Sequence, residues 1–499
     1  MKFRKIIAAV TALCLAVPAG IAGTVSALDQ NVKGDVNADT VFNLADMVMF
    51  QRWLSGRGDI TAHTNADVNG DGEYDIFDLS TMRKMLVENI SNAPQPSFAP
   101  SARNLCAGIS ASDIKGKDAD EQFINSQASF AVDLFKKTYA EKVGENDLIS
   151  PYSVMQALSM TANGAGGTTR KEMENVLGGG LSMDALNSYL MTQRQKTVNT
   201  EKNEYTNKWE INTANSIWAR DDQNRIQVRP EFIQKCVDYY DSEFYLAPFD
   251  ESTLNDVNGW VNEKTHEMIP KILEYIDYND VMYLVNAVTF EAEWEQPYES
   301  YNVKKDKFTA ADGTVQDAEM LCSTEKYITD ENTKGMMKYY SGYRYAFAAL
   351  LPDESISVDD YIEQLTAEKL SGLLNNNSYE QANVKLPKFK YEYGNELSDE
   401  LKAMGMKTAF DEETADFSEM SAINDLNPLH IGYVIHKTFI DLDENGTKAA
   451  AATLVAMKDN GMPIKPEIDV VFDRPFVYCI VDTETELPVF IGVLNSLEQ

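Results

Sequence analysis

One run of small residues near the C-terminus places the strongest constraint on how this chain can fold. It reads DENGTKAAAAT at residues 443–453. Taken alone it predicts a short exposed helix, because Thr447 can cap the N-terminus, alanines are good helix formers, and Gly461 can end the helix.

The flanking segments favour a different structure. Residues 434–442 and 468–478 are rich in β-branched and aromatic side chains and partly alternate, as strands do. A segment without bulky side chains can enter between two such strands. As a strand, the run would place one set of residues on one face, Thr447, Ala449, Ala451 and Thr453, and another on the opposite face, Lys448, Ala450, Ala452 and Leu454. The sequence therefore predicts a segment with two alternative structures.

The order of a glutamate, a glycine, a threonine and then alanines resembles the hinge of inhibitory serpins. Other segments match that family in chain order, at 146–153, 284–294, 384–389, 401–406, 409–410, 415–418 and 488–492. The resemblance implies the α+β serpin fold, with a helical N-terminal part, a large mixed sheet A, smaller sheets B and C, and an exposed reactive loop.

The resemblance also implies suicide inhibition of a serine protease, or of a cysteine protease. The protease attacks a carbonyl in the loop and forms an acyl-enzyme. The freed segment from Thr447 to about Met457 then inserts into sheet A as an extra strand and distorts the attached protease. The native state must be held short of its most stable packing for this to work.

The reactive bond is predicted by counting along the loop. The family's distance from the hinge glutamate, Glu444, gives Asn460 as the acyl donor and Gly461 beyond it. Counting back from Pro475 gives Ile464 instead. The other alternative acyl donors are Met457, Lys458, Asp459 and Met462.

Two further groups of residues carry over from the family. The hinge comprises Glu444, Gly446, Thr447, Ala449, Ala450, Ala451, Ala452 and Thr453. The sheet-opening region comprises Ser150, Ser153, Asn286, His436 and Trp294. Within it we expect a satisfied core histidine that is hydrogen-bonded to its neighbours, and a tryptophan at the point where the loop first enters the sheet.

A repeat near the N-terminus predicts a metal-binding module. Residues 35–46 recur 32 residues later as 67–78, and both copies place oxygen-bearing side chains at positions 1, 3, 5, 9 and 12 of an EF-hand loop, with a carbonyl at position 7. The predicted ligands are Asp35, Asn37, Asp39, Val41, Asn43 and Asp46 in the first loop and Asp67, Asn69, Asp71, Glu73, Asp75 and Asp78 in the second. We therefore expect two structural Ca²⁺ ions, and no cofactor for inhibition.

Each loop leads into an amphipathic helix, at 44–54 and 76–87. A short loop-helix unit that occurs twice, with aspartate at position 12, resembles a dockerin, a small all-α module that binds a cohesin on a scaffold protein. The residues expected to face the cohesin are Leu44, Ala45, Gln51 and Arg52 in the first copy and Ile76, Phe77, Arg83 and Lys84 in the second. Thr40 replaces the usual glycine of the first loop, so weaker calcium binding is expected there.

The chain should comprise a signal peptide at 1–27, a dockerin at 28–90, a linker at 91–117 and a serpin at 118–499. The export signal predicts a secreted, extracellular protein that is associated with the scaffold or cell surface through its dockerin, with a monomeric serpin part. Removing residues 1–27 takes away three basic and no acidic residues, which changes the formal net charge from -34 to -37. Nucleic acid is therefore an improbable partner. No later segment is apolar for long enough to span a bilayer.

The four cysteines beyond the signal are scattered, which favours buried single thiols. No pattern assembles a nucleophile and a base, so we expect no enzyme. Two alternatives remain open: a non-inhibitory serpin that acts as a carrier or chaperone, and a dockerin-borne polysaccharide hydrolase that uses paired carboxylates. The permissive hinge argues against the first, and the serpin-like segments argue against the second.

Overall fold

A computed structural model describes residues 33–37, 42, 44–56, 59–92, 101–202, 208–277, 280–375, 379–423, 429–447 and 466–498. The chain divides into two compact units, residues 1–97 and 98–499. The predicted signal peptide lies outside the described residues. No helix among the described residues has the length and apolar character that a bilayer crossing requires.

The smaller unit is built from two helices and the loops that precede them. Helix α1 spans Leu44–Leu54, as predicted, and α2 spans Ile76–Asn92, which extends beyond the predicted end; the short η1 at His63–Asn65 lies between them. Its core consists of Val36, Phe50, Ile60, Ala66, Val68, Leu79 and Met82. The repeat therefore folds into one shared apolar core rather than two separate ones.

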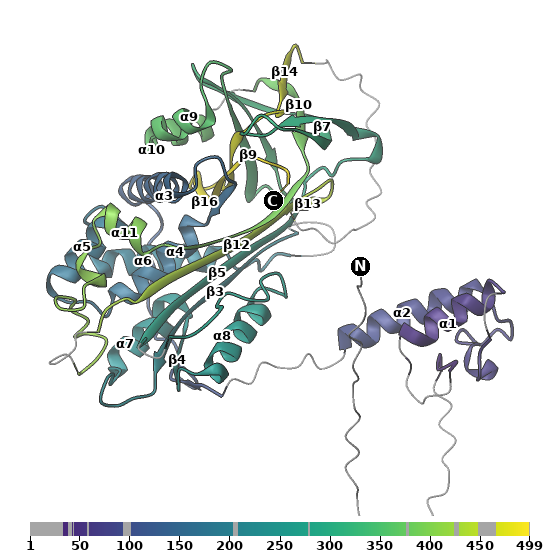
Figure 1. The fold of residues 1–499 in the computed structure, drawn as a ribbon, viewed down its shortest axis with the longest axis horizontal. Helices are drawn as coiled ribbons and strands as arrows, with labels where there is room; N and C mark the ends of the chain where they lie inside the picture. Colours follow the sequence, from purple (N-terminus) through teal and green to yellow (C-terminus); the bar gives the residue numbers. More distant parts are fainter. Residues whose placement is uncertain are drawn as a thin grey trace, which may run out of the picture. The chain divides into compact units, whose positions relative to one another are not determined.

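The larger unit contains a seven-stranded mixed sheet, sheet A (Figure 1). Its order is β1 (Arg103–Asn104), β4 (Glu243–Ala247), β3 (Trp209–Arg220), β5 (Met282–Glu293), β13 (Gly446–Thr447), β12 (Tyr433–Leu442) and β11 (Phe389–Glu396). Alternate residues of β12 are buried and partly exposed, which is the pattern expected of a strand with one face on a core.

The second sheet has nine strands. Its order is β14 (Ile468–Val471), β10 (Gln381–Pro387), β7 (Val315–Thr329), β8 (Thr333–Tyr339), β9 (Tyr345–Pro352), β15 (Phe476–Asp482), β16 (Leu487–Leu494) and β2 (Asp147–Ile149), with β6 (Val303–Thr309) paired to β7. The smaller sheets that the resemblance implied are thus joined in one hydrogen-bonded sheet, because the 15-residue strand β7 pairs with β6 and β10 over its first part and with β8 over its last four residues.

Helices cover both faces of sheet A (Figure 1). On one face α8 (Glu251–Lys264) packs Val257, Trp260 and Val261 against sheet residues. The other helices are α3 (Glu121–Glu141), α4 (Pro151–Ala162), α5 (Gly167–Gly178), α6 (Met183–Lys196), α7 (Pro230–Lys235) with the π-helical η2 (Cys236–Tyr240), α9 (Val358–Gln364), α10 (Ala367–Leu374) and α11 (Ser398–Met404), together with the short η3 (Ser300–Asn302) and η4 (Thr408–Phe410).

The segment before α3 packs against the larger unit. Strand β1 pairs with β4 at the edge of sheet A, and Asp256 of α8 accepts hydrogen bonds from Ser101 and Ala102. Further along, the Lys117 backbone N–H donates to Ser188. Residues 101–117 of the predicted linker therefore belong to the folded surface of this unit, and residues 93–100 lie outside the described residues.

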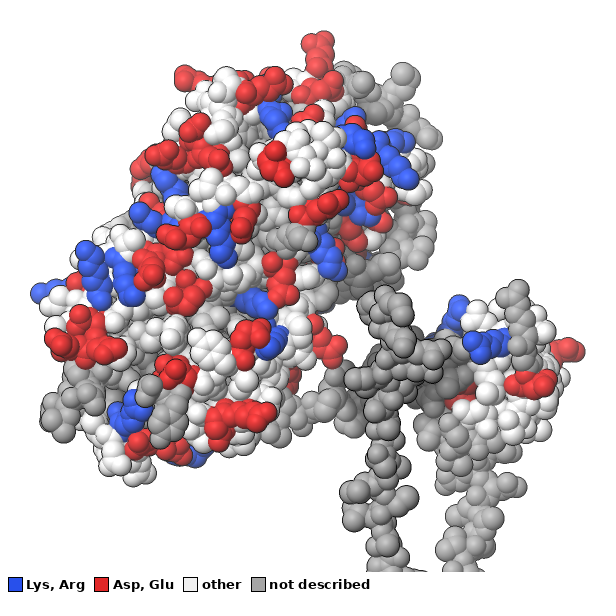
Figure 2. All heavy atoms as spheres, viewed as in Figure 1, with Lys and Arg blue, Asp and Glu red and all other residues white. Residues whose placement is uncertain are grey.

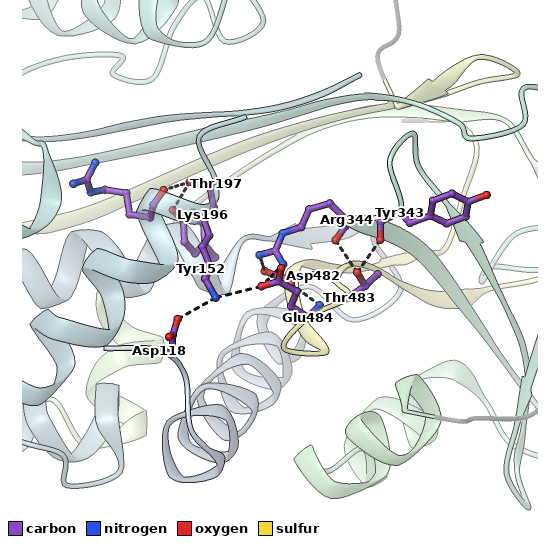
Figure 3. Close-up of polar contacts among 10 residues, drawn as sticks. Asp118, Tyr152, Lys196, Thr197, Tyr343, Arg344, Asp482, Thr483 and Glu484 are labelled. Carbon is purple, nitrogen blue, oxygen red and sulfur yellow. Dashed lines mark hydrogen bonds and ion pairs between the residues drawn. The ribbon is translucent and has the colours of Figure 1, made fainter. Parts of the chain in front are cut away.

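Ion pairs fasten the C-terminal hairpin to the helical side (Figure 3). Arg344 contacts Asp482 at 2.5 Å and Glu484 at 2.7 Å, and Lys196 at the end of α6 bridges Glu484 (3.4 Å) and Asp118 (3.1 Å). Burial raises the pKa of Asp482, although the nearby guanidinium opposes this. Breaking the buried Arg344–Asp482 pair would leave an uncompensated charge, whereas the two Lys196 pairs are exposed to solvent and should contribute little.

Acidic side chains cover much of the visible face of the larger unit, with lysines and arginines interspersed (Figure 2). This distribution agrees with the formal net charge of -34 for the whole chain.

Candidate functional site

The candidate site is the seam between β5 and β12 in the middle of sheet A. These strands are parallel and pair directly over six residues, from Tyr433 opposite Tyr283 to Thr438 opposite Val288. Beyond that point β13 lies between them (Figure 1). Thr447 pairs with Ala292 on one side and Leu442 on the other. The sheet thus accepts the first two residues of an extra, antiparallel strand.

A glycine is required where the chain enters the seam. A Cβ atom on Gly446 would lie 1.9 Å from the backbone oxygen of Ala292. The turn before it is also specified by sequence, since the Asp443 carboxylate accepts hydrogen bonds from the backbone N–H groups of Asn445 (2.7 Å) and Gly446 (3.2 Å). A tight turn followed by a close backbone contact explains why an aspartate and a glycine stand here.

Trp294 contacts this turn through two hydrogen bonds. Its indole N–H donates to the Asp443 carbonyl at 2.9 Å, and its backbone N–H donates to Asn445 at 2.8 Å. The Tyr298 backbone N–H donates to the Glu444 carbonyl at 2.8 Å. The Glu444 side chain forms an ion pair with Lys388 at 2.8 Å, which lowers the pKa of that carboxyl. The turn that leads into the seam is therefore fixed by contacts with Trp294, Tyr298 and Lys388.

Thr447 is buried, with 1% of its surface exposed. Its hydroxyl lies 2.6 Å from the hydroxyl of Tyr340, a fully buried ring that stacks on Trp294 with centroids 4.4 Å apart. Thr447 therefore faces the core, as its place on the small-residue face predicts. Sequence reasoning missed Tyr340, because nothing in the local pattern around it distinguishes it from the other tyrosines nearby.

The remaining sheet-opening residues lie together under the paired part of β5 and β12. The Ser150 backbone N–H donates to His436 Nε2 at 3.0 Å, so this nitrogen is the acceptor and Nδ1 carries the proton toward Asn286 Oδ1, 2.5 Å away. Asn286 Nδ2 in turn donates to Ser153 Oγ (2.6 Å). Asn215 of β3, which we did not predict, also accepts from it (2.5 Å). The network joins α4, β3, β5 and β12.

Burial makes His436 a neutral group over the physiological range. It is fully buried, and desolvation lowers its pKa from 6.5 to about 3. Because the unfolded chain takes up this proton near pH 6.5, the stability that the neutral ring contributes is present above pH 6.5. It is lost progressively as the pH falls toward 3.

Between pH 6 and pH 4, His436 should lower the free energy of unfolding by about 2–3 kcal/mol. Urea unfolding of wild type and His436→Gln across this range measures the effect as a difference in slope. The variant is needed because a second buried group acts in the opposite direction. Burial raises the pKa of Asp147 from 3.8 to about 7, so its contribution to the free energy of unfolding increases as the pH falls. Parallel pH profiles for the two proteins would contradict the assignment.

The loop that carries the predicted reactive bond lies outside the described residues. This applies to the later hinge residues and to every candidate acyl donor, that is Ala449, Ala450, Ala451, Ala452, Thr453, Met457, Lys458, Asp459, Asn460, Gly461, Met462 and Ile464.

In the smaller unit, the aspartate at position 12 makes equivalent contacts in the two repeats. Asp78 accepts hydrogen bonds from the backbone N–H groups of Val68 (2.9 Å) and Asn69 (3.1 Å). Asp46 accepts equivalent bonds from Val36 (3.0 Å) and Asn37 (3.1 Å). Both aspartates are fully buried. Position 12 therefore closes each loop in the same way.

The second loop is described throughout, and it offers hard oxygen donors. Asp67 accepts from the backbone of Gly70 (2.7 Å) and Gly72 (3.0 Å), which wraps the loop around its carboxylate. Among the described residues no three Asp, Glu, His or Cys side chains gather as a metal site on their own. The Asn69 amide and the Glu73 carbonyl are the further oxygen donors of the predicted set, and hard oxygen donors of this kind suit Ca²⁺. In the first loop, Asp39, Val41 and Asn43 lie outside the described residues.

Chelation should unfold or loosen the smaller unit. We expect EDTA to reduce the helical circular dichroism signal, with calcium restoring it, because the loops hold the core together. Calorimetric titration of wild type should give two ions, and Asp67→Ala should give one. Asp59→Ala, at an exposed position outside both loops, is the matched control. An unchanged ion count in the Asp67 variant would contradict the assignment of the second loop.

The residues expected to face a cohesin are exposed wherever their side chains are described. Ile76 is 62% and Phe77 67% exposed, and Arg83 and Lys84 lie on the same helix with exposed side chains. In the first copy Gln51 and Arg52 are exposed. The side chains of Leu44 and Ala45 lie outside the described set. Two large apolar side chains left in solvent are typical of a binding surface.

Comparisons with known proteins agree with both parts. A model of the family "Serpin (serine protease inhibitor)" matches residues 125–497, and one of the "Dockerin type I domain" matches residues 33–87. A crystal structure of a thermophilic serpin, Tengpin, in the native state is similar over 79% of this chain and all of that one, with 44% identity and a TM-score of 0.74. Tengpin in the latent state gives a TM-score of 0.66 at 41% identity, over 77% of this chain and all of that one. A leukocyte elastase inhibitor of Xenopus tropicalis is 28% identical over 75% of this chain and its own full length.

Proposed function

Because the chain belongs to the serpin family and carries a type I dockerin domain, we propose that it is an exported suicide inhibitor of serine proteases, tethered to a scaffold. A cohesin on that scaffold would hold the calcium-loaded dockerin. The comparisons agree with the serpin fold and the dockerin that the sequence predicted. Members of the serpin family are mostly protease inhibitors rather than enzymes. The target, the tether and the export are the proposal.

The observation that carries the proposal is the register of the seam. Asn286 stands opposite His436 where β5 and β12 pair directly, and Ala292 and Leu442 both stand opposite Thr447 where β13 separates them. The two strands therefore keep the same offset in both regions. A longer strand can enter when they part sideways, without sliding along each other. A one-residue slip would instead reverse every side chain to the wrong face.

The same register specifies where the loop residues would lie after insertion. Continuing both pairings one residue at a time brings Thr453 between Asn286 and His436. It brings Ala451 between Val288 and Thr438. The residues that replace the direct pairing are thus small or β-branched at each inward position, and the strand they form bonds on both sides.

Until the loop is cut, the bound protease supplies the nucleophile for the reaction. The serine hydroxyl of the protease attacks the carbonyl carbon of Asn460, an ester forms, and the bond to Gly461 breaks with a new amine on the glycine. This chain then supplies the driving force, because the released segment is free to follow the register above. Inhibition requires that insertion finishes before water hydrolyses the ester.

The test is incubation with a panel of serine proteases, followed by denaturing electrophoresis. We expect a covalent adduct with at least one protease, and mass spectrometry of the released C-terminal peptide should find Gly461 as its first residue. Cleavage of the loop by every protease without any adduct would overturn the inhibitory function. A separate pull-down on an immobilised cohesin, with and without EDTA, tests the tether.

A further inference from the structure

The Tyr340 hydroxyl lies beneath the point where the hinge enters sheet A, and the inhibitory mechanism above assigns it no role. Tyr340 follows β8 and forms a bridge with Trp294. Its ring stacks on Trp294 and meets Phe290 edge-on, with centroids 5.0 Å apart. These contacts hold the ring in place without using its oxygen. Among the described residues, Thr447 is the partner that the structure gives to this hydroxyl.

Both oxygens of this pair are removed from solvent. Tyr340 is fully buried and Thr447 is 1% exposed, and burial raises the pKa of the tyrosine. A buried hydroxyl without a partner is costly, whereas a pair of apolar groups of the same shape costs little. While the hinge is docked, removing either hydroxyl would therefore leave the other one buried without a hydrogen-bond partner. When the hinge leaves the seam, water can reach both.

We propose that Tyr340 is a positioning residue that receives the Thr447 hydroxyl and so holds the first two hinge residues in sheet A before any bond is cut. It follows that position 447 needs a hydroxyl as well as a small side chain. The significance of the docked hinge rests on the proposed inhibitory function, since docking sets the register in which the rest of the loop would follow. The contact itself does not depend on that function.

The test measures docking in the intact protein, without a protease. Hydrogen–deuterium exchange of the peptide that contains residues 443–447 reports how often the hinge leaves the seam. We expect Thr447→Val and Tyr340→Phe each to speed this exchange about tenfold, because each leaves one buried hydroxyl without a partner. Thr447→Ser, which keeps the hydroxyl, should exchange within about threefold of wild type.

The double variant Thr447→Val with Tyr340→Phe decides between positioning and simple packing. It has no unpaired hydroxyl, so its exchange should return to within about threefold of wild type. If the two substitutions only loosened packing, their effects would multiply, and the double variant would exchange faster than either single one. That result, or wild-type exchange in Thr447→Val, overturns the proposal. A failure to trap any protease would leave these exchange rates untouched, so the two hypotheses fail separately.

Discussion

Replacing Thr447 by arginine should turn the protein from an inhibitor into a substrate. The wild-type residue is 1% exposed, pairs with Ala292 and Leu442, and faces the core beside Tyr340. An arginine there would carry an unpaired charge under the sheet as the loop inserts, at a cost of several kcal/mol. Because each 1.4 kcal/mol is a factor of ten, we expect about 100-fold fewer trapped complexes per cleavage.

The measurement is a titration of the target protease with wild type and variant, with the products resolved by denaturing electrophoresis. The variant should yield cleaved inhibitor and free, active protease. Lys448→Arg is the matched control, because alternation along the strand directs that charge to the solvent face. Adduct formation by Thr447→Arg at the wild-type yield would show that trapping does not require residue 447 to occupy its place in the sheet.

How far the sequence alone predicts this site depends on the kind of contact involved. Gly446 and Thr447 could be recognised because a close backbone approach and a small buried side chain restrict the residue type. His436 and Trp294 were singled out through the family resemblance, and in the structure His436 accepts a hydrogen bond from Ser150 while Trp294 donates to the Asp443 carbonyl. At each of these positions the residue type itself indicates the role, so the sequence is enough to single it out.

Contacts between distant segments were not accessible in the same way. Tyr340 and Asn215 matter only because the fold brings them to Thr447 and Asn286, which lie 107 and 71 residues away. The joining of the smaller sheets through β7 likewise depends on strand pairing, which local alternation does not specify. The EF-hand loops are the opposite case. Their expected ligands follow one another within twelve residues, so spacing alone is enough to propose them.

Cutting the loop beyond residue 457 should raise the melting temperature of the serpin domain by more than about 10 °C. In a large domain, about 1 kcal/mol of stabilisation shifts the midpoint by roughly 2–4 °C, so this rise corresponds to several kcal/mol, beyond what a surface contact supplies. The source is the exchange at the seam. Six directly paired positions of β5 and β12 would be replaced by a central strand that bonds to both neighbours.

Calorimetry of intact and nicked protein measures this rise, and two proline variants locate its origin. Ala451→Pro removes a backbone donor within the inserted strand and should abolish most of the gain, whereas Lys465→Pro, beyond the predicted bond, should leave it intact. If nicked and intact wild type melt together, the seam is not a site of insertion. The partial entry of Gly446 and Thr447 would then be the final extent of this strand, and the common offset of β5 and β12 would have no mechanical consequence.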